Sequence, residues 1–212
     1  PERAEMKKIP PYNGFEQGPI RPPSEAESLL IRITRNCPWN RCTFCPVYKD
    51  EKFSLRPLAH VLEDIDTVKS YVDAIDEAKR SGARYYGDFI KDGVEDEVAL
   101  HAAYHFVAGG MTSIFLQDGN SLIIKPEEMI TILRHLQVCF PMVERITSYA
   151  RSHTIARISD ENLKKMAEVG LNRIHIGMES GSDKVLKMVK KGVDKTTQVR
   201  AGQKVRQAGI EL

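Results

Sequence analysis

The sequence predicts an α/β fold with a parallel sheet, and two observations support that prediction. Short apolar and β-branched runs alternate with longer segments in which apolar residues recur every three or four positions. Polar or glycine-containing loops follow the short runs, as is typical where parallel strands deliver the chain to a binding edge. Strands and helices that alternate in this order build parallel sheets with right-handed crossovers.

Four strands are expected, at residues 29–34, 112–116, 143–147 and 173–177. The first is almost entirely apolar or β-branched, as a strand buried on both faces should be. Residues 210–212 have the character of the opening of a fifth strand. The chain is therefore expected to be a fragment of a longer protein, because a sheet that stopped there would leave an unpaired edge.

The helical segments lie between these strands. Expected helices cover residues 58–80, 98–107, 126–139, 160–169, 183–191 and 194–208. Pro126 with the acids after it, and Ser159 and Ser182 as capping residues, mark helix starts, and glycines mark the ends. Two helices precede the second strand, which is more than a simple crossover needs, so residues 83–110 are predicted to be a helical insertion.

Composition narrows the class of protein. The chain has 212 residues, 28% of them charged and 42% hydrophobic, with a formal net charge of +2. These values are ordinary for a globular domain, and they do not indicate a nucleic-acid-binding surface. No apolar run approaches the roughly 20 residues that a membrane helix needs, and no signal peptide opens the chain, so a cytoplasmic location without membrane association is expected. Residues 1–27, rich in Pro, Gly and charge, are predicted to be an extended arm that wraps the domain or a partner, or a mobile lead-in. The core domain is predicted at 28–212.

Three of the four cysteines, Cys37, Cys42 and Cys45, lie within nine residues directly after the first predicted strand. A structural zinc ion normally takes four protein ligands, whereas an iron–sulfur cluster held by three thiolates keeps one iron open. The ligand count favours the cluster. A zinc site completed by a distant residue stays open as an alternative, and disulfides are disfavoured in a chain of this kind.

This stretch resembles the cluster loop of the radical S-adenosylmethionine (radical SAM) superfamily. The usual pattern there is Cys-x3-Cys-x2-Cys with an aromatic residue before the last cysteine, and Phe44 fills the aromatic place. The first gap is longer by one residue, giving Cys-x4-Cys-x2-Cys. A second stretch, 177–182, is similar to one found in methylthiotransferases and in coproporphyrinogen-type and cobalamin-dependent members. The resemblance implies a partial (βα) barrel of six units, of which this sequence supplies four and the start of a fifth.

The resemblance also implies a chemistry. The three cysteines would hold a [4Fe–4S] cluster, and S-adenosylmethionine (SAM) would chelate the open iron. The reduced cluster would cleave SAM to a 5′-deoxyadenosyl radical that abstracts hydrogen from an unidentified substrate. An electron donor of the flavodoxin or ferredoxin type is implied. A module that keeps the cluster for electron transfer or binding without SAM cleavage, and a zinc-binding α/β module, are the alternatives.

SAM contacts are carried over by position. The expected contacts are Phe44, Asp118, Gly119, Asn120, Arg151, Glu179 and Ser180, with Arg200 as an additional candidate. Residues 118–120 occupy the place of the family's Gly-Gly-Glu motif, and they also fit an ordinary strand-to-helix turn. Outside this set, His101 and His105 share a helix face without a third ligand, and Cys139 is expected to be a buried thiol.

Overall fold

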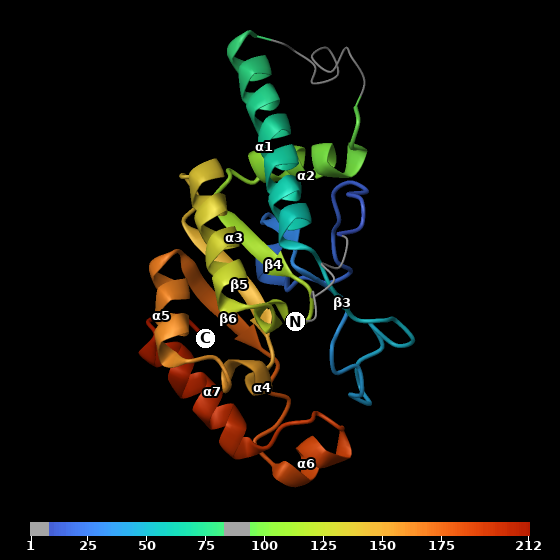
Figure 1. The fold of residues 1–212 in the computed structure, drawn as a ribbon, viewed down its shortest axis with the longest axis vertical. Coiled ribbons are helices and arrows are strands. Elements are labelled where there is room, and N and C mark those ends of the chain that lie inside the picture. Colours follow the sequence, from blue (N-terminus) through green and yellow to red (C-terminus); the bar gives the residue numbers. More distant parts are fainter. Residues whose placement is uncertain (1–8, 83–93) are drawn as a thin grey trace, which may run out of the picture.

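The computed structural model describes residues 9–82 and 94–212. Its centre is a four-stranded sheet in the order β1-β4-β5-β6, with every neighbouring pair parallel (Figure 1). The strands are β1 (Leu29–Arg32), β4 (Ser113–Gln117), β5 (Arg145–Ala150) and β6 (Leu171–Ile176). Beyond β6, Glu211 forms a parallel bridge with Arg173, as expected for the start of a fifth strand. The predicted α/β class and parallel sheet are confirmed.

Helices cover the sheet. They are α1 (Leu58–Arg80), α2 (Glu97–Ala108), α3 (Pro126–Cys139), α4 (Ser152–Ile155), α5 (Asp160–Glu168), α6 (Asp183–Met188) and α7 (Lys195–Gln207), with short 3-10 turns at Pro23–Glu25 (η1) and Ser121–Ile123 (η3). Helices α1 and α3 pack against each other in front of the strands, and α2 crosses α1 near its middle (Figure 1). Their apolar faces form one core with the sheet, including Ile65, Phe106 and Leu133.

Two predicted strands differ from the structure in informative ways. The first was expected over 29–34, but β1 ends at Arg32, and Thr34–Arg35 (β2) pairs antiparallel with Ser54–Leu55 (β3). This small ladder closes the base of the cysteine-containing loop. The third was expected over 143–147, but β5 begins at Arg145 and continues to Ala150, because β6 supplies ladder partners for Tyr149 and Ala150.

Among the described helices, α2, α5 and α7 begin with a side-chain cap. Ser159 caps α5 by accepting from the backbone N–H of Asn162, and Asp194 caps α7 by accepting from that of Thr197. Ser182 stands before α6, but its hydroxyl makes no capping bond, so that predicted cap is wrong. The four-residue α4 was not expected.

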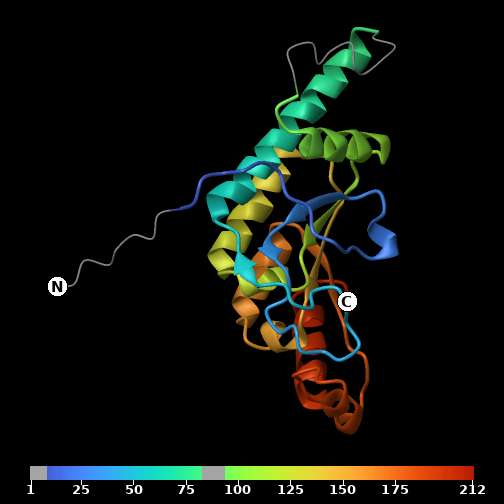
Figure 2. The ribbon, with the colours of Figure 1, turned by 90° about the vertical axis from the view of Figure 1, so that its right-hand side faces the viewer.

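The described part of the N-terminal arm lies against the domain. Phe15 is buried, Tyr12 donates from its hydroxyl to Asp64 of α1 (2.9 Å), and the backbone N–H of Gly18 donates to the Gln117 side chain (2.8 Å). Figure 2 shows this segment crossing beside α1 and reaching the side of the sheet opposite α1 and α3. Residues 9–27 therefore wrap the domain. The proposed limits of arm and core stay a prediction, and residues 83–93 of the predicted insertion lie outside the described residues.

Among the residues that the structure describes, no helix combines the length and apolar character that crossing a bilayer requires.

Candidate functional site

Four loops meet at the carboxyl edge of the sheet and enclose a cavity of about 180 Å³. One loop follows β2 and carries the three cysteines, and the others follow β4, β5 and β6. The cavity is lined by Ile20, Cys37, Cys42, Phe44, Cys45, Tyr48, Gly119, Tyr149, Ala150, Arg151, His175, Gly177, Glu179 and Lys191. The carboxyl edge is where parallel α/β folds place their ligands.

The three loop cysteines are free, half-buried thiols that all face this cavity. In the described part of the chain, their sulfur atoms do not form a group within 4.8 Å of one another. Burial raises the pKa of the Cys42 thiol, and the positive charges of Lys191 and Arg151 oppose that rise. Both cations also line the cavity, so the site offers thiolate ligands beside compensating positive charge.

The cysteine loop is fastened to the segment between α6 and α7. The Trp39 indole N–H donates to the carbonyl of Lys190 (2.7 Å), and the Thr43 N–H donates to the carbonyl of Val189 (3.0 Å). Gly192 lies directly under the Trp39 ring, where a Cβ would be 2.7 Å from Cη2 and closer still to two other ring atoms. The path of this loop therefore depends on a glycine some 150 residues away in sequence.

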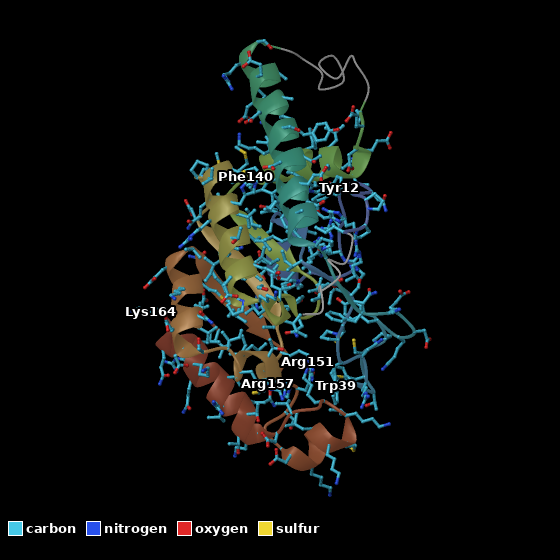
Figure 3. The ribbon with its side chains drawn as sticks, in the orientation of Figure 1. Tyr12, Trp39, Phe140, Arg151, Arg157 and Lys164 are labelled. Atoms are coloured by element: carbon cyan, nitrogen blue, oxygen red, sulfur yellow. The ribbon has the colours of Figure 1, made fainter. Side chains whose placement is uncertain are left out.

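Arg151 joins the loop to the end of β5. Its guanidinium carbon lies 4.9 Å from the Trp39 ring centroid, and its Nη2 donates to the carbonyl of Lys191 (2.8 Å). Figure 3 shows Arg151 and Trp39 beside each other between the sheet and α6. Burial lowers the pKa of Arg151, and the nearby Cys37 and Cys42 oppose that change. The guanidinium is thus a partly desolvated cation aimed at the thiol cluster.

Of residues 118–120, only Gly119 lines the cavity. The Asp118 side chain is fully buried, where it accepts from Arg32 (2.8 Å), from the Asn36 N–H (3.2 Å) and from the Tyr48 hydroxyl. Burial, and then this bond with Asp118, raise the pKa of Tyr48. Asp118 therefore holds the start of the cysteine loop.

Asn120 is also buried and also bonded to the protein. Its side-chain oxygen accepts from the Arg151 N–H (2.9 Å), and its nitrogen donates to the Thr154 hydroxyl (2.9 Å). In this structure Asp118 and Asn120, two of the polar side chains predicted to contact SAM, instead bond to neighbouring loops.

Glu179 and Phe44 both line the cavity, and both lie near the Lys191 ammonium. The Lys191 ammonium lies 2.9 Å from a Glu179 carboxylate oxygen and 5.6 Å from the Phe44 ring centroid. Glu179 has φ of 61°, a left-handed conformation that is uncommon for a residue other than glycine, asparagine or aspartate. Ser180 instead lines a neighbouring cavity against α7, and Arg200 is an exposed residue of α7 outside both cavities.

Sequence reasoning missed a polar group beneath the cavity. Glu25 of the arm is fully buried, and its carboxylate accepts from Ser28 (2.5 Å) and Arg145 (3.3 Å). The Nε2 of His175 lies 3.9 Å from the same carboxylate and has no hydrogen-bond partner. The sequence signal was the position of His175 near the end of a predicted strand, opposite Tyr149 in β5.

The remaining sequence candidates fall elsewhere. His101 and His105 line a separate cavity with the arm, and in the described part of the chain no third metal ligand joins them. Cys139 is buried, as predicted.

The chain resembles known proteins over most of its length. The family model described as the radical SAM superfamily matches residues 31–212. The 4′-phospho-dehydrooxetanocin synthase of Priestia megaterium is 27% identical over 192 residues, which are 87% of this chain and 22% of that protein.

Solved structures give the same picture for the fold. The cobalamin-dependent SAM radical enzyme OxsB, with aqua-cobalamin and SAM bound, superposes with a TM-score of 0.58 at 20% identity over 87% of this chain and 23% of its own. The radical SAM methyltransferase TsrM from Kitasatospora setae gives 0.52 at 17% identity, over 88% of this chain and 30% of its own. The chain thus spans less than a third of the length of these proteins.

Proposed function

The chain belongs to the radical SAM superfamily, and from that premise we propose that it binds a [4Fe–4S] cluster through Cys37, Cys42 and Cys45 and positions SAM for reductive cleavage. The observation that carries this proposal is the convergence of three free thiols, two cations and one carboxylate on a single cavity at the carboxyl edge of the sheet.

The donor set fits a cluster better than a single zinc ion. Tetrahedral zinc with Zn–S bonds near 2.3 Å would bring its thiolates to about 3.8 Å from one another. The three loop sulfur atoms do not gather within 4.8 Å, and in the described residues no fourth Cys, His, Asp or Glu ligand joins them in such a group. Three thiols without a fourth protein ligand in the described part of the chain suit an iron–sulfur cluster that would keep one iron open.

The residues around the thiols have distinct proposed roles. A reduced cluster held by these cysteines would supply one electron to break the sulfur–C5′ bond of SAM, giving methionine and the 5′-deoxyadenosyl radical that would abstract hydrogen from the substrate. Arg151 and Lys191 offset the negative charge that three thiolates bring into a partly desolvated site.

The other residues are assigned to SAM itself. Glu179 suits the SAM ammonium or ribose hydroxyls, and Phe44 the adenine. Gly119 lets the backbone approach closely because it has no side chain. Ser180 supports the Glu179 turn. Asp118 and Asn120 act by holding the loops that carry these contacts.

The electron donor of the reaction is proposed by protein class only. A flavodoxin- or ferredoxin-type protein supplies the electron, and the substrate is assigned no class, because the chain covers only 22% of its curated relative. The cytoplasmic location stays a prediction.

The test begins with anaerobic reconstitution of the chain. About four irons and matching sulfide per chain, an EPR signal of the dithionite-reduced protein that changes on adding SAM, and 5′-deoxyadenosine in the product mixture are the expected results. Cys42→Ser should lose iron and sulfide. Thr43→Ala is the matched control, because the Thr43 side chain is exposed and the variant keeps the adjacent Cys42.

Each contrary result points to a named alternative. Zinc without sulfide would leave a zinc-binding α/β module. A cluster whose EPR signal ignores SAM would leave an electron-transfer or binding module.

A further inference from the structure

A second group of metal-ligating side chains lies on the helical layer, away from the cysteine loop. Asp66 is on α1, and His135 and Cys139 are four residues apart on α3. Helices α1 and α3 pack against each other, which brings the three side chains together. In Figure 3, Phe140, the neighbour of Cys139, and Trp39 of the cysteine loop lie far apart along the long axis of the molecule.

The three ligand atoms converge on one point. Cys139 Sγ is 3.7 Å from His135 Nε2 and 3.8 Å from Asp66 Oδ1, and these last two atoms are 2.6 Å apart. A tetrahedral ion with Zn–N and Zn–O bonds near 2.0 Å and a Zn–S bond near 2.3 Å would set the two sulfur distances at about 3.5 Å. The same ion would set the N···O distance at about 3.3 Å. The sulfur distances already match to a few tenths of an ångström, and the Asp66 side chain is exposed, so its rotation would widen the N···O distance to the required value.

The geometry argues against a nucleophilic triad. In a Cys–His–Asp triad the two imidazole nitrogens face different partners, one the nucleophile and the other the orienting carboxylate. Here Asp66 and Cys139 both address Nε2 of His135. The oxygen, sulfur and nitrogen atoms that come together here are compatible with one metal ion shared by the three side chains.

The three side chains of this group differ in their exposure to solvent. Cys139 is 8% exposed, whereas the Asp66 and His135 side chains are 61% and 29% exposed. A bound ion would therefore be reached from solvent and would take water as its fourth ligand. Thiolate, imidazole and carboxylate together select borderline divalent transition metals over hard ions such as Mg²⁺ or Ca²⁺.

We propose that Asp66, His135 and Cys139 form a binding site for one divalent transition-metal ion of the zinc class, which clamps α1 to α3. Binding forms three coordinate bonds, and the Cys139 thiol releases its proton to solvent. No electron transfer is involved. The site is independent of the cysteine loop and of the function proposed for it.

Co²⁺ is the probe, because a thiolate–Co²⁺ bond gives a charge-transfer absorption that water and carboxylate ligands do not. The full chain is titrated anaerobically, both as the native sequence and with all three loop cysteines changed to serine. We expect one equivalent of Co²⁺ with a thiolate band to survive in the serine background. Adding Cys139→Ser should abolish the band. Asp66→Asn or His135→Gln should weaken binding at least about tenfold, since even outer-shell changes cost 10–100-fold.

Two controls keep the result specific. His101→Gln removes another helical histidine and should leave the Co²⁺ titration unchanged, and circular dichroism checks that each variant is folded.

Zinc should raise the melting temperature of the serine background but not of its Cys139→Ser derivative. Absence of a thiolate band in the folded serine background would overturn the proposal. A band of unchanged affinity in His135→Gln would overturn it too, by reducing the site to a lone thiol.

Discussion

Gly192→Ala is the sharpest test of how the cysteine loop is held. Gly192 has φ of 71°, and an added Cβ would meet the Trp39 ring at van der Waals overlap. Trp39 is bonded to the Lys190 carbonyl and stacked by Arg151, so the ring cannot retreat without breaking those contacts.

Two contributions set the magnitude. A left-handed conformation costs an alanine about 1–2 kcal/mol, and overpacking costs about 1–3 kcal/mol more. If Trp39 leaves instead, the lost hydrogen bond is worth about 1 kcal/mol and the lost cation–π contact about 0.5–1 kcal/mol. Whether Trp39 stays in place and is overpacked or moves away, the clash adds about 1–3 kcal/mol to the conformational cost of Gly192→Ala.

Gly209→Ala is the matched control. Gly209 has φ of 79°, and a Cβ added to it would meet nothing within 4 Å, so it carries the conformational cost without the clash. For a chain of this size, 1 kcal/mol corresponds to roughly 2–4 °C in melting temperature. We expect Gly209→Ala to lower the melting temperature by roughly 2–8 °C. Gly192→Ala should lower it further or release Trp39.

Trp39 is the only tryptophan of the chain, so its fluorescence reports the outcome directly. In the cluster-free protein, Gly192→Ala should shift Trp39 emission to longer wavelength and increase quenching by acrylamide, and after reconstitution it should retain less iron. Equal emission, quenching and melting temperature in Gly192→Ala and Gly209→Ala would refute the claim that Gly192 sets the path of the loop.

Three further predictions follow from the same region. Asp118→Asn should destabilise the fold by about 1–3 kcal/mol in urea unfolding, because the amide nitrogen would face a donor, either Arg32 or the Tyr48 hydroxyl, while Glu16 still pairs with Arg32; a loss below about 0.5 kcal/mol would contradict that role. Burial opposes ionisation of Glu16, but Arg35 and the neighbouring arginines outweigh it and hold the pKa of Glu16 below its usual range. Because the pKa of Glu16 is lower in the folded chain than in the unfolded chain, Glu16 stabilises the fold at pH values above its unfolded pKa, and this stability is lost as the pH falls through its folded pKa. Limited proteolysis should therefore cut the arm faster near pH 4 than at pH 7, and Glu16→Gln should lose that difference. Glu179→Gln should weaken SAM binding about 10–100-fold in equilibrium dialysis, the worth of one charge-assisted hydrogen bond, while iron content stays at the native level; unchanged affinity would remove Glu179 from the proposed SAM site.

Much of the fold was predictable because its determinants are local. Apolar periodicity identified all four sheet strands and the long helices, since each pattern states which face of an element is buried. Ser159 and Asp194 cap their helices through bonds that span three residues. The cysteine loop and Glu179 could be placed at one edge of the sheet for the same reason, because each follows a recognisable strand, and their roles stay predictions.

The amino-acid sequence alone was enough to predict the fold class, the position of the cysteine loop and its place at the carboxyl edge of the sheet. Which polar side chains line the cavity at that edge could be read only from the packed structure. Asp118 turns inward because Arg32, 86 residues away, reaches it, and His175 meets a carboxylate brought by the arm. Asp66 and Cys139, on separate helices, become neighbours only when α1 packs on α3. Periodicity encodes burial along one element, whereas the partner of a polar group is fixed by packing between elements distant in sequence.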